Sequence, residues 1–300
     1  MNTMKIAMIG AQELEGEAVA KAFKQAKCAL TLLVEDPSKA KQQLGQGFEY
    51  KYCDTSSLSL LKTALLGVDS VYISLKCVDE SSAQQMVNQI KNIVAACQFC
   101  NVKTIGLLSQ LQVSEENAPL FYEVAAIYEC EQHVINSGLN YFIFCPAPFM
   151  ECLPQYVHGR QLYHYIKSEK IIAWLALKDF AQAVLKTYQH GAIEKARFIL
   201  QGDSQYSLQQ AIYLYAQEVY RGVKFESVEV FLSWLRISFS VDKELLHGAK
   251  KARFLGQART VIDDKSEQGH WLLPNPKTQL KSWCHSQILV KRQDQTALSA

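Results

Sequence analysis

The sequence predicts an α/β protein, a doubly wound parallel sheet with a smaller α+β subdomain after it. Two observations carry this prediction. Short apolar runs alternate with amphipathic stretches through the first half of the chain, a spacing typical of parallel strands joined by covering helices. The alternation weakens after about residue 150, which indicates a change of architecture. Three hundred residues suit one large domain or a main domain with a smaller companion.

The strands are predicted from β-rich apolar runs bounded by turn residues. They cover Lys5–Ile9, Ala29–Val34, Glu49–Cys53, Ser70–Ser74, Thr104–Leu108, Tyr141–Cys145 and Ala196–Gln201. Helices are expected to begin near Glu15, Asp36, Ser57, Ser82 and Pro119. Gly67, Asn101 and Gly138 stand just before strands, where a helix ends in the left-handed conformation that these residue types tolerate.

The second half is less regular, and five features are predicted in it. They are a loop with a short helix over Tyr156–Lys170, a helix over Asp179–Tyr188, a helix over Ser207–Val219 capped by Ser207, an irregular helical region from Phe225, and a solvated tail after Val290. We expect one domain over residues 1–152 and a second over 153–300, with parts of about 171–202 packing back on the sheet. Val228–Phe239 is either an interface or part of the second domain's core.

The composition is that of an ordinary globular protein. A net charge of +2 and 49% hydrophobic residues give no reason to expect nucleic acid as a partner. No apolar run approaches the roughly 20 residues of a membrane span, and the N-terminus lacks the form of a signal peptide. Nine scattered cysteines favour free thiols. We therefore expect a cytoplasmic protein with no membrane contact.

The order of motifs resembles the NmrA-like proteins, which are atypical short-chain dehydrogenase/reductases. The resemblance extends over nearly the whole chain and rests on eight stretches in the family's order. They are Ile9–Phe23, Val34–Ala40, Leu60–Ser74, Asn92–Ser109, Glu129–Glu151, Leu175–Tyr188, Phe198–Gln210 and Pro274–Trp283. The resemblance implies an N-terminal Rossmann domain that binds NAD(P) along the carboxyl ends of its strands. The family contains both reductases and non-enzymatic regulators, so the fold leaves the function open.

The resemblance places the pyrophosphate-binding turn at "GAQELEG", Gly10 to Gly16. Gly10 and Gly16 keep the first and third glycine positions, but Glu13 replaces the middle glycine, which normally lets the backbone approach the pyrophosphate. A carboxylate about 4 Å from a phosphate charge costs roughly 1 kcal/mol in water and about 4 kcal/mol at a surface dielectric. Either Glu13 turns outward and the site works, or the site is weakened and Glu13, Glu15 and Glu17 take the place of the phosphate beside the helix N-terminus.

Glu35 follows the second predicted strand, where the family often carries a basic residue for the 2′-phosphate of NADP. A carboxylate there accepts hydrogen bonds from ribose hydroxyls and repels that phosphate. If a nucleotide binds, NAD(H) is therefore expected ahead of NADP(H); the alternative that no nucleotide binds stays open. Alternatively, Glu35 and Asp36 only begin the next helix, while Lys39 and Lys41 keep NADP(H) open. The remaining cofactor-binding candidates are Gln12, Asp54, Leu75, Lys76, Ser109, Pro146 and Phe149.

The usual catalytic pair of the wider family, a tyrosine with a lysine four residues later, is not found where it is expected. Ile127 stands at the lysine position, and Cys145 replaces the usual arginine before Pro146. The Tyr163–Lys167 match is interpreted as chance. Ser109 and His133 are the remaining catalytic candidates. Cys152, Tyr156 and Tyr163 are candidates for contact with a substrate or partner, and no metal site is predicted, because Cys97 and Cys100 have no second cysteine pair.

Three functions remain open at this point. The leading hypothesis is a regulator or redox sensor, nucleotide-dependent or vestigial, that acts through a protein partner. The second is an NAD(P)H-dependent reductase of a quinone-like or enone-like small molecule. The third is a small-molecule binding module without hydride transfer. The oligomeric state is not predicted.

Overall fold

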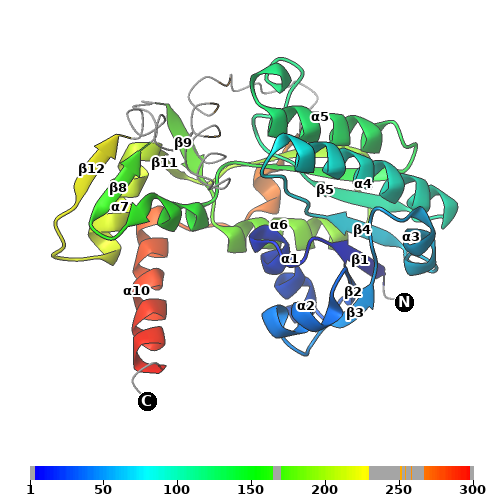
Figure 1. Cartoon of the computed structure of the whole chain (residues 1–300), viewed down its shortest axis with the longest axis horizontal. Helices are drawn as coiled ribbons and strands as arrows, with labels where there is room; N and C mark the ends of the chain where they lie inside the picture. The colour runs from blue at the N-terminus through cyan, green and yellow to red at the C-terminus, as the bar shows by residue number, and fades with distance from the viewer. Residues whose placement is uncertain are drawn as a thin grey trace. The chain divides into compact units, whose positions relative to one another are not determined.

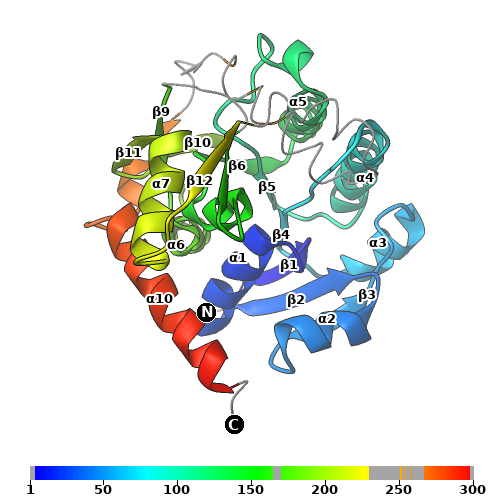
Figure 2. The ribbon, with the colours of Figure 1, turned by 60° about the vertical axis from the view of Figure 1, so that its left-hand side comes forward.

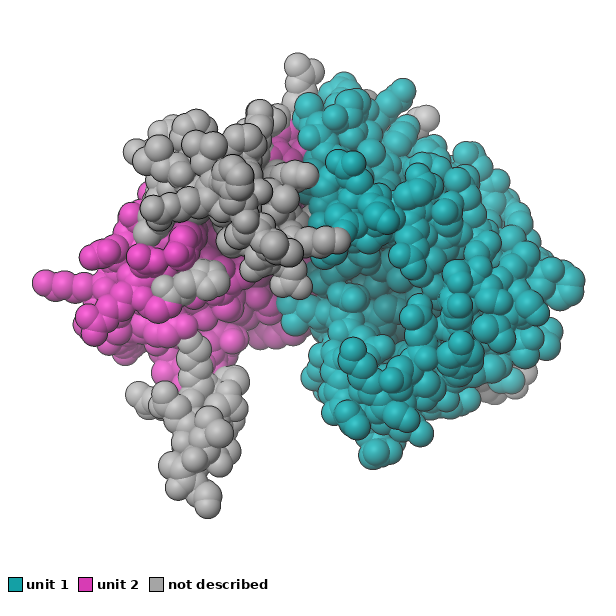
Figure 3. Space-filling view, viewed as in Figure 1, with its two compact units in different colours: residues 1–146, 180–200, 259–273 teal, residues 147–179, 201–258, 274–300 magenta. Residues whose placement is uncertain are grey.

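The computed structural model describes residues 4–164, 170–229, 251, 254, 258 and 267–297. The chain divides into two compact units, coloured separately in Figure 3. Unit 1 comprises residues 1–146, 180–200 and 259–273, and unit 2 comprises residues 147–179, 201–258 and 274–300. Each unit is therefore assembled from three separate segments of the chain.

Unit 1 contains an eight-stranded sheet in which every pairing is parallel. Its order is β13-β10-β6-β5-β4-β1-β2-β3, and Figure 2 shows the strands from β3 to β10 in this sequence. The strands are β1 (Lys5–Ile9), β2 (Ala29–Val34), β3 (Glu49–Tyr52), β4 (Ser70–Ile73), β5 (Thr104–Leu108), β6 (Asn140–Pro146), β10 (Ala196–Leu200) and β13 (Glu267–Gln268). The order reverses between β1 and β4, which makes this the topological switch point of a Rossmann-type sheet.

Helices cover both faces of this sheet (Figure 1). They are α1 (Leu14–Gln25), α2 (Pro37–Leu44), α3 (Leu58–Ala64), α4 (Glu80–Phe99), α5 (Tyr122–Ile135) and α6 (Leu177–His190), with the short η1 (Ala118–Leu120) and η4 (Gly269–Leu272). The Phe23 ring of α1 meets the Tyr188 ring of α6 at 5.2 Å, so these two helices share one face. Helices α3, α4 and α5 pack side by side on the other face. The predicted doubly wound α/β fold is confirmed.

Local sequence signals explain where the helices begin and end. Asp79 and Ser82 form a reciprocal capping box at the start of α4, which satisfies backbone donors that the first helical turn leaves unpaired. Gly67, Asn101 and Gly138 all have positive φ, at 74°, 55° and 78°. The predicted left-handed helix ends are therefore confirmed.

Unit 2 is built around a core to which Trp174, Tyr215 and Trp283 contribute large buried side chains. Its elements are η2 (Met150–Tyr156), β7 (Val157–His158), β8 (Gln161–His164), β9 (Ile171–Trp174), β11 (Ser204–Ser207), α7 (Leu208–Val219), β12 (Glu226–Glu229) and α10 (Leu280–Ala297). Strands β12, β8 and β7 form one small sheet, and β11 and β9 form another. The Ser207 cap of α7 is confirmed, since its hydroxyl accepts a hydrogen bond from the Gln210 N–H.

Three predictions for this half are corrected. The stretch Tyr156–Lys170 contains an antiparallel hairpin of β7 and β8 instead of a short helix, because Gly159 turns the chain with a φ of +60° and Leu162 is buried in the core; residues 165–169 lie outside the described ones. The irregular helical region predicted from Phe225 begins instead with strand β12, which pairs with β8; apart from 251, 254 and 258, residues 230–266 lie outside the described ones. The backbone of 291–297 is helical and continues α10, and most of Val228–Phe239 lies outside the described residues. In the part of the chain that the structure describes, no helix combines the length and the apolar character needed to cross a membrane.

Candidate functional site

The parallel sheet brings most of the predicted cofactor residues to one edge. In parallel strands all carboxyl ends lie on the same side, and ligands of open α/β sheets bind there. The residues that follow β1, β2, β3, β4, β5 and β6, or end them, are Gly10, Glu35, Asp54, Leu75, Lys76, Ser109 and Pro146. Their shared position is a consequence of topology.

The two glycines of the turn are required by the fold itself. Gly10 has a φ of +80°, and a Cβ built on it would lie 1.8 Å from the carbonyl oxygen of Ser74. A Cβ on Gly16 would lie 2.0 Å from the carbonyl oxygen of Gly10. Both distances are shorter than any real contact, so no side chain fits at either position. Gly10 is thus required because the turn passes close to the end of β4, and Gly16 because α1 packs close to the end of β1.

Glu13 occupies a position that the backbone does not reserve for glycine. Its φ and ψ are −74° and 153°, ordinary extended values, and it is the N-cap residue of α1 without a side-chain capping hydrogen bond. Its backbone N–H donates to Gly10 O at 3.2 Å. The neighbouring Gln12 turns toward α2, where its backbone oxygen accepts a 2.8 Å hydrogen bond from the Gln43 amide.

Three charged side chains meet in front of the N-terminus of α1. Lys76 Nζ lies 2.7 Å from Glu15 Oε2 and 3.6 Å from Glu13 Oε2. The Glu15 side chain is 10% exposed, whereas those of Lys76 and Glu13 are 41% and 42% exposed. The pyrophosphate of a dinucleotide would lie at this helix N-terminus. We call Glu13, Glu15 and Lys76 the turn cluster; its two carboxylates and one ammonium carry a net charge of −1.

The ends of β2 and β3 are ordered by local hydrogen bonds. Glu35 is exposed directly after β2. Asp36 caps α2, since its Oδ1 accepts hydrogen bonds from the N–H groups of Ser38 and Lys39 at 2.9 and 3.0 Å; the helix-start interpretation therefore holds for Asp36. Asp54 accepts two hydrogen bonds from Ser56, which lower the pKa of its carboxyl.

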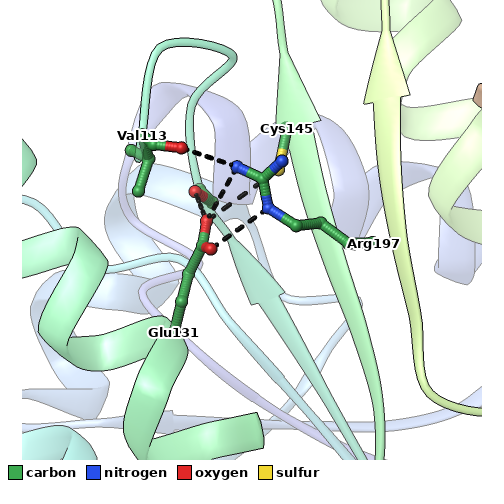
Figure 4. Close-up of polar contacts among 5 residues, drawn as sticks. Val113, Glu131, Cys145 and Arg197 are labelled. Carbon is green, nitrogen blue, oxygen red and sulfur yellow. Dashed lines mark hydrogen bonds and ion pairs between the residues drawn. The ribbon is translucent and has the colours of Figure 1, made fainter. Parts of the chain in front are cut away.

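A second charged cluster is buried at the ends of β5 and β6 (Figure 4). Ser109 Oγ donates a short hydrogen bond to Glu131 Oε1, and Arg197 Nε donates to Glu131 Oε2 at 3.1 Å. The guanidinium also donates to the carbonyl oxygen of Val113 at 2.9 Å, and Cys145 Sγ lies 3.9 Å from Glu131. Burial raises the pKa values of the Glu131 carboxyl and of the Cys145 thiol. We call Ser109, Glu131, Cys145 and Arg197 the buried cluster.

Sequence reasoning missed Glu131 and Arg197. The sequence indicated only that Cys145 replaces the arginine usual in the resembled family and that Ser109 is a catalytic candidate. In the structure, the Arg197 guanidinium comes from β10, the strand next to β6, and Glu131 links it to Ser109. A charged residue inside an apolar strand, as Arg197 is in "ARFIL", was the available signal, because such a charge is rarely buried without a partner.

His133 is not brought together with the buried cluster. It lies on α5 two residues after Glu131, and residues two apart on a helix point to different faces. Its Nε2 lies 3.5 Å from Glu129, which also pairs with Lys91 of α4. The Tyr122 hydroxyl donates to the carbonyl oxygen of Val78 at 2.8 Å, and burial raises its pKa.

The predicted substrate or partner residues belong to unit 2, as does Phe149. Phe149 is buried and bridges to Leu175, and its carbonyl oxygen accepts a hydrogen bond from Cys152 N–H. Tyr156 is part of the unit's core, and Tyr163 packs partly against that core from β8. A shallow groove of about 460 Å³ over α7 contains none of them; it is lined by Tyr206, Gln209, Gln210, Tyr213, Leu214 and Gln217. Among the described residues, no group of His, Cys, Asp and Glu side chains is arranged to hold a metal ion.

The sheet order, the switch point and the tight turn before α1 define a dinucleotide-binding α/β domain. A comparison with protein-family models matches residues 10–161, just over half of the chain, to the NAD(P)H-binding family. The chain belongs to this family. A comparison with curated protein sequences finds no match.

Solved structures confirm the fold over nearly the whole chain. A nucleoside-diphosphate-sugar epimerase from Staphylococcus aureus has 17% identity and a TM-score of 0.77, over 94% of this chain and 100% of that one. An NADPH-dependent quinone oxidoreductase of Escherichia coli, complexed with NADPH, has 21% identity and a TM-score of 0.75, over 94% and 99%. A triphenylmethane reductase of Citrobacter sp., complexed with NADP(H), has 18% identity and a TM-score of 0.74, over 95% and 100%.

Proposed function

We propose that this protein binds NAD(P)H as a signal and passes the state of the nucleotide to a protein partner, as an NmrA-like regulator does. One observation carries the proposal. The hydroxyl at the end of β5, where hydride chemistry would need a proton donor, already gives its hydrogen to a buried, ion-paired carboxylate.

Reduction of a carbonyl or quinone requires a proton as well as a hydride, and enzymes place an acid within hydrogen-bond reach of the substrate oxygen. In the buried cluster the Ser109 hydrogen points to Glu131. The Cys145 side chain is fully buried, and burial raises its pKa. The Tyr122 hydrogen is donated to a backbone carbonyl. The Ser109 and Tyr122 hydroxyls donate their hydrogens to other groups of the protein, and the Cys145 thiol is buried. None of the three is therefore placed to give a proton to a substrate, which favours nucleotide binding without turnover.

The backbone of the turn is suited to a dinucleotide, whereas its carboxylates would repel the negatively charged pyrophosphate. Gly10 and Gly16 allow the close turn that the family uses, and the Ser74 Oγ beside it is buried without a hydrogen-bond partner among the described residues. Glu13 and Glu15 face the same helix N-terminus. Weak, readily reversible binding suits a sensor, since occupancy then follows the nucleotide concentration.

We further propose a preference for NAD(H) over NADP(H). The exposed carboxylate of Glu35 follows β2, where it would accept hydrogen bonds from the ribose and repel a 2′-phosphate. The E. coli and Citrobacter neighbours hold NADPH and NADP(H), so this preference would set the chain apart from them. All nine cysteines are free thiols, which supports the proposed cytoplasmic location.

A reductase is the second candidate, because two structural neighbours are an NADPH-dependent quinone oxidoreductase and a triphenylmethane reductase. A cationic dye accepts hydride at carbon without a coupled proton transfer, so the committed hydroxyls would not prevent this reaction.

The test combines calorimetric titration with turnover assays on the purified full chain. NAD⁺, NADH, NADP⁺ and NADPH are titrated first, and NADH oxidation is then followed with a quinone, an enone and a triphenylmethane dye. The proposal expects binding without oxidation, and a different protease-cleavage pattern with NADH than with NAD⁺. Sustained NADH oxidation by any acceptor would establish the reductase instead. No binding at millimolar nucleotide would exclude both and leave a binding module for another ligand.

A further inference from the structure

The turn cluster contains one cation that two partners would compete for. Lys76 Nζ bridges Glu15 and Glu13 at 2.7 and 3.6 Å, and it stands where the pyrophosphate of a dinucleotide would approach the N-terminus of α1. We infer that Lys76 is the phosphate anchor of this site and that Glu13 and Glu15 are a built-in competitor, so that nucleotide affinity is set by the transfer of Lys76 from carboxylate to phosphate. This inference rests on the proposed nucleotide binding.

The charges require such a transfer. Two carboxylates and one ammonium leave the cluster at −1, and a pyrophosphate diester brings about two further negative charges. Without Lys76 the ligand would meet two carboxylates and only the partial positive charge of the helix end, about +0.5. When Lys76 turns to the phosphate, its ammonium forms an ion pair with the ligand instead of with the carboxylates.

The exposures make the transfer feasible. Lys76 is 41% exposed on a segment that follows β4, so its four-carbon chain can reorient in solvent. Glu13 is also exposed and can swing outward, whereas Glu15 is 10% exposed and stays beside the turn. Glu15 is therefore the stronger competitor, as its 2.7 Å contact also indicates.

The chain contains a matched control for these carboxylates. Glu17 lies in the same first turn of α1, but its carboxylate pairs with Lys21 at 2.5 Å. Glu17→Gln removes the same charge from the same helix end without touching Lys76. A general electrostatic effect would act at Glu17 as well, whereas competition for Lys76 acts through Glu13 and Glu15, the carboxylates that lie against it.

The experiment measures the dissociation constants of NADH and ADP-ribose for the wild type and for Glu15→Gln, Glu13→Gln/Glu15→Gln, Glu17→Gln and Lys76→Met. We expect Glu15→Gln to bind at least tenfold tighter, the double variant tighter again, and Glu17→Gln within about threefold of the wild type. Lys76→Met should lose at least tenfold. ADP-ribose keeps the pyrophosphate and lacks nicotinamide, so it should show the same changes, and adenosine should show none.

A thermodynamic cycle separates an anchor from a structural residue. Lys76→Met is repeated in the Glu13→Gln/Glu15→Gln background, where the competing carboxylates are absent and the lysine–phosphate contact alone is lost. Equal effects of Glu15→Gln and Glu17→Gln, or adenosine changing as much as ADP-ribose, would overturn the inference while the proposed function stands. If neither the wild type nor the double variant binds any nucleotide, the proposed function itself fails.

Discussion

Two charged clusters lie at the carboxyl edge of the same sheet, and they differ in how firmly they are held. In the turn cluster, Lys76 and Glu13 are about two-fifths exposed, and ion pairs join the lysine to Glu13 and Glu15. In the buried cluster, the side chains of Glu131 and Arg197 are 4% and 15% exposed, and a serine, a thiol and a backbone carbonyl also contact them. Exposed ion pairs contribute little to stability and rearrange easily. Removing one partner of a buried pair is strongly destabilising. The first cluster is thus suited to respond to a ligand, and the second to fix the strand ends.

The largest effect is expected when the buried pair is broken. Arg197→Met leaves the Glu131 carboxyl buried without its cation, so that it must either stay charged at a desolvation cost or take up a proton, and the free energy of unfolding should fall by about 3–5 kcal/mol. Lys91→Met, which breaks the exposed pair with Glu129, should cost at most about 1 kcal/mol. Urea denaturation of both variants provides the comparison. Similar losses in the two would mean that the buried cluster is no more fixed than a surface pair.

Substitutions in the glycine turn should lower stability nearly as much, but only at the positions where the backbone leaves no room for a side chain. Gly16→Ala puts a methyl group against the Gly10 carbonyl oxygen and should cost about 3 kcal/mol, the upper end of typical overpacking penalties. Glu13→Gly changes a residue with ordinary backbone angles and should alter stability by at most about 1 kcal/mol. Thermal melting of both variants would decide the point. A larger loss of stability in Glu13→Gly than in Gly16→Ala would contradict the conclusion that the fold constrains Gly16 and does not constrain position 13.

Alkaline pH should destabilise the α4–α5 side of unit 1. Burial raises the pKa values of Cys97 and Cys130 from 9.0 to about 12. The unfolded chain therefore releases these protons first, and the free energy of unfolding should fall as pH rises from about 9 to about 12, by about 1.4 kcal/mol per pH unit for each thiol. Denaturation profiles of the wild type and of Cys97→Ala/Cys130→Ala across this range test it. The variant should be less stable at neutral pH and lose less with pH; parallel profiles would refute the assignment.

The smallest effects on stability are expected for the two neighbouring carboxylates after β2, which should differ in what they do. Asp36→Ala removes the cap of α2 and should cost about 1 kcal/mol. Glu35→Ala removes an exposed charge, and stability should stay within about 0.5 kcal/mol, while binding shifts toward NADP(H). Denaturation and nucleotide titration are both needed. An unchanged nucleotide preference in Glu35→Ala would remove Glu35 from the site.

The elements of unit 1 were largely predictable because local pattern and final environment agree. β1, β2 and β5 have the predicted bounds, and the left-handed residue before β5 is Asn101, as expected. Prediction failed at β7 and β8, whose short hairpin depends on the pairing of β8 with β12, 65 residues later, and on burial of Leu162. Local propensity carries no information about such partners.

By itself, the sequence determined the strand–helix alternation, the fixed glycines and the carboxyl edge where a ligand would lie, since these follow from periodicity and from the conformational limits of single residues. It also placed Glu13 between the two glycines of the turn. Only the tertiary structure decided what the charges do. It joined Lys76 to Glu15 across the switch point and brought Arg197 to Glu131 over a separation of 66 residues. The physical reason is that charge interactions depend on distance and burial, and both are properties of the folded chain.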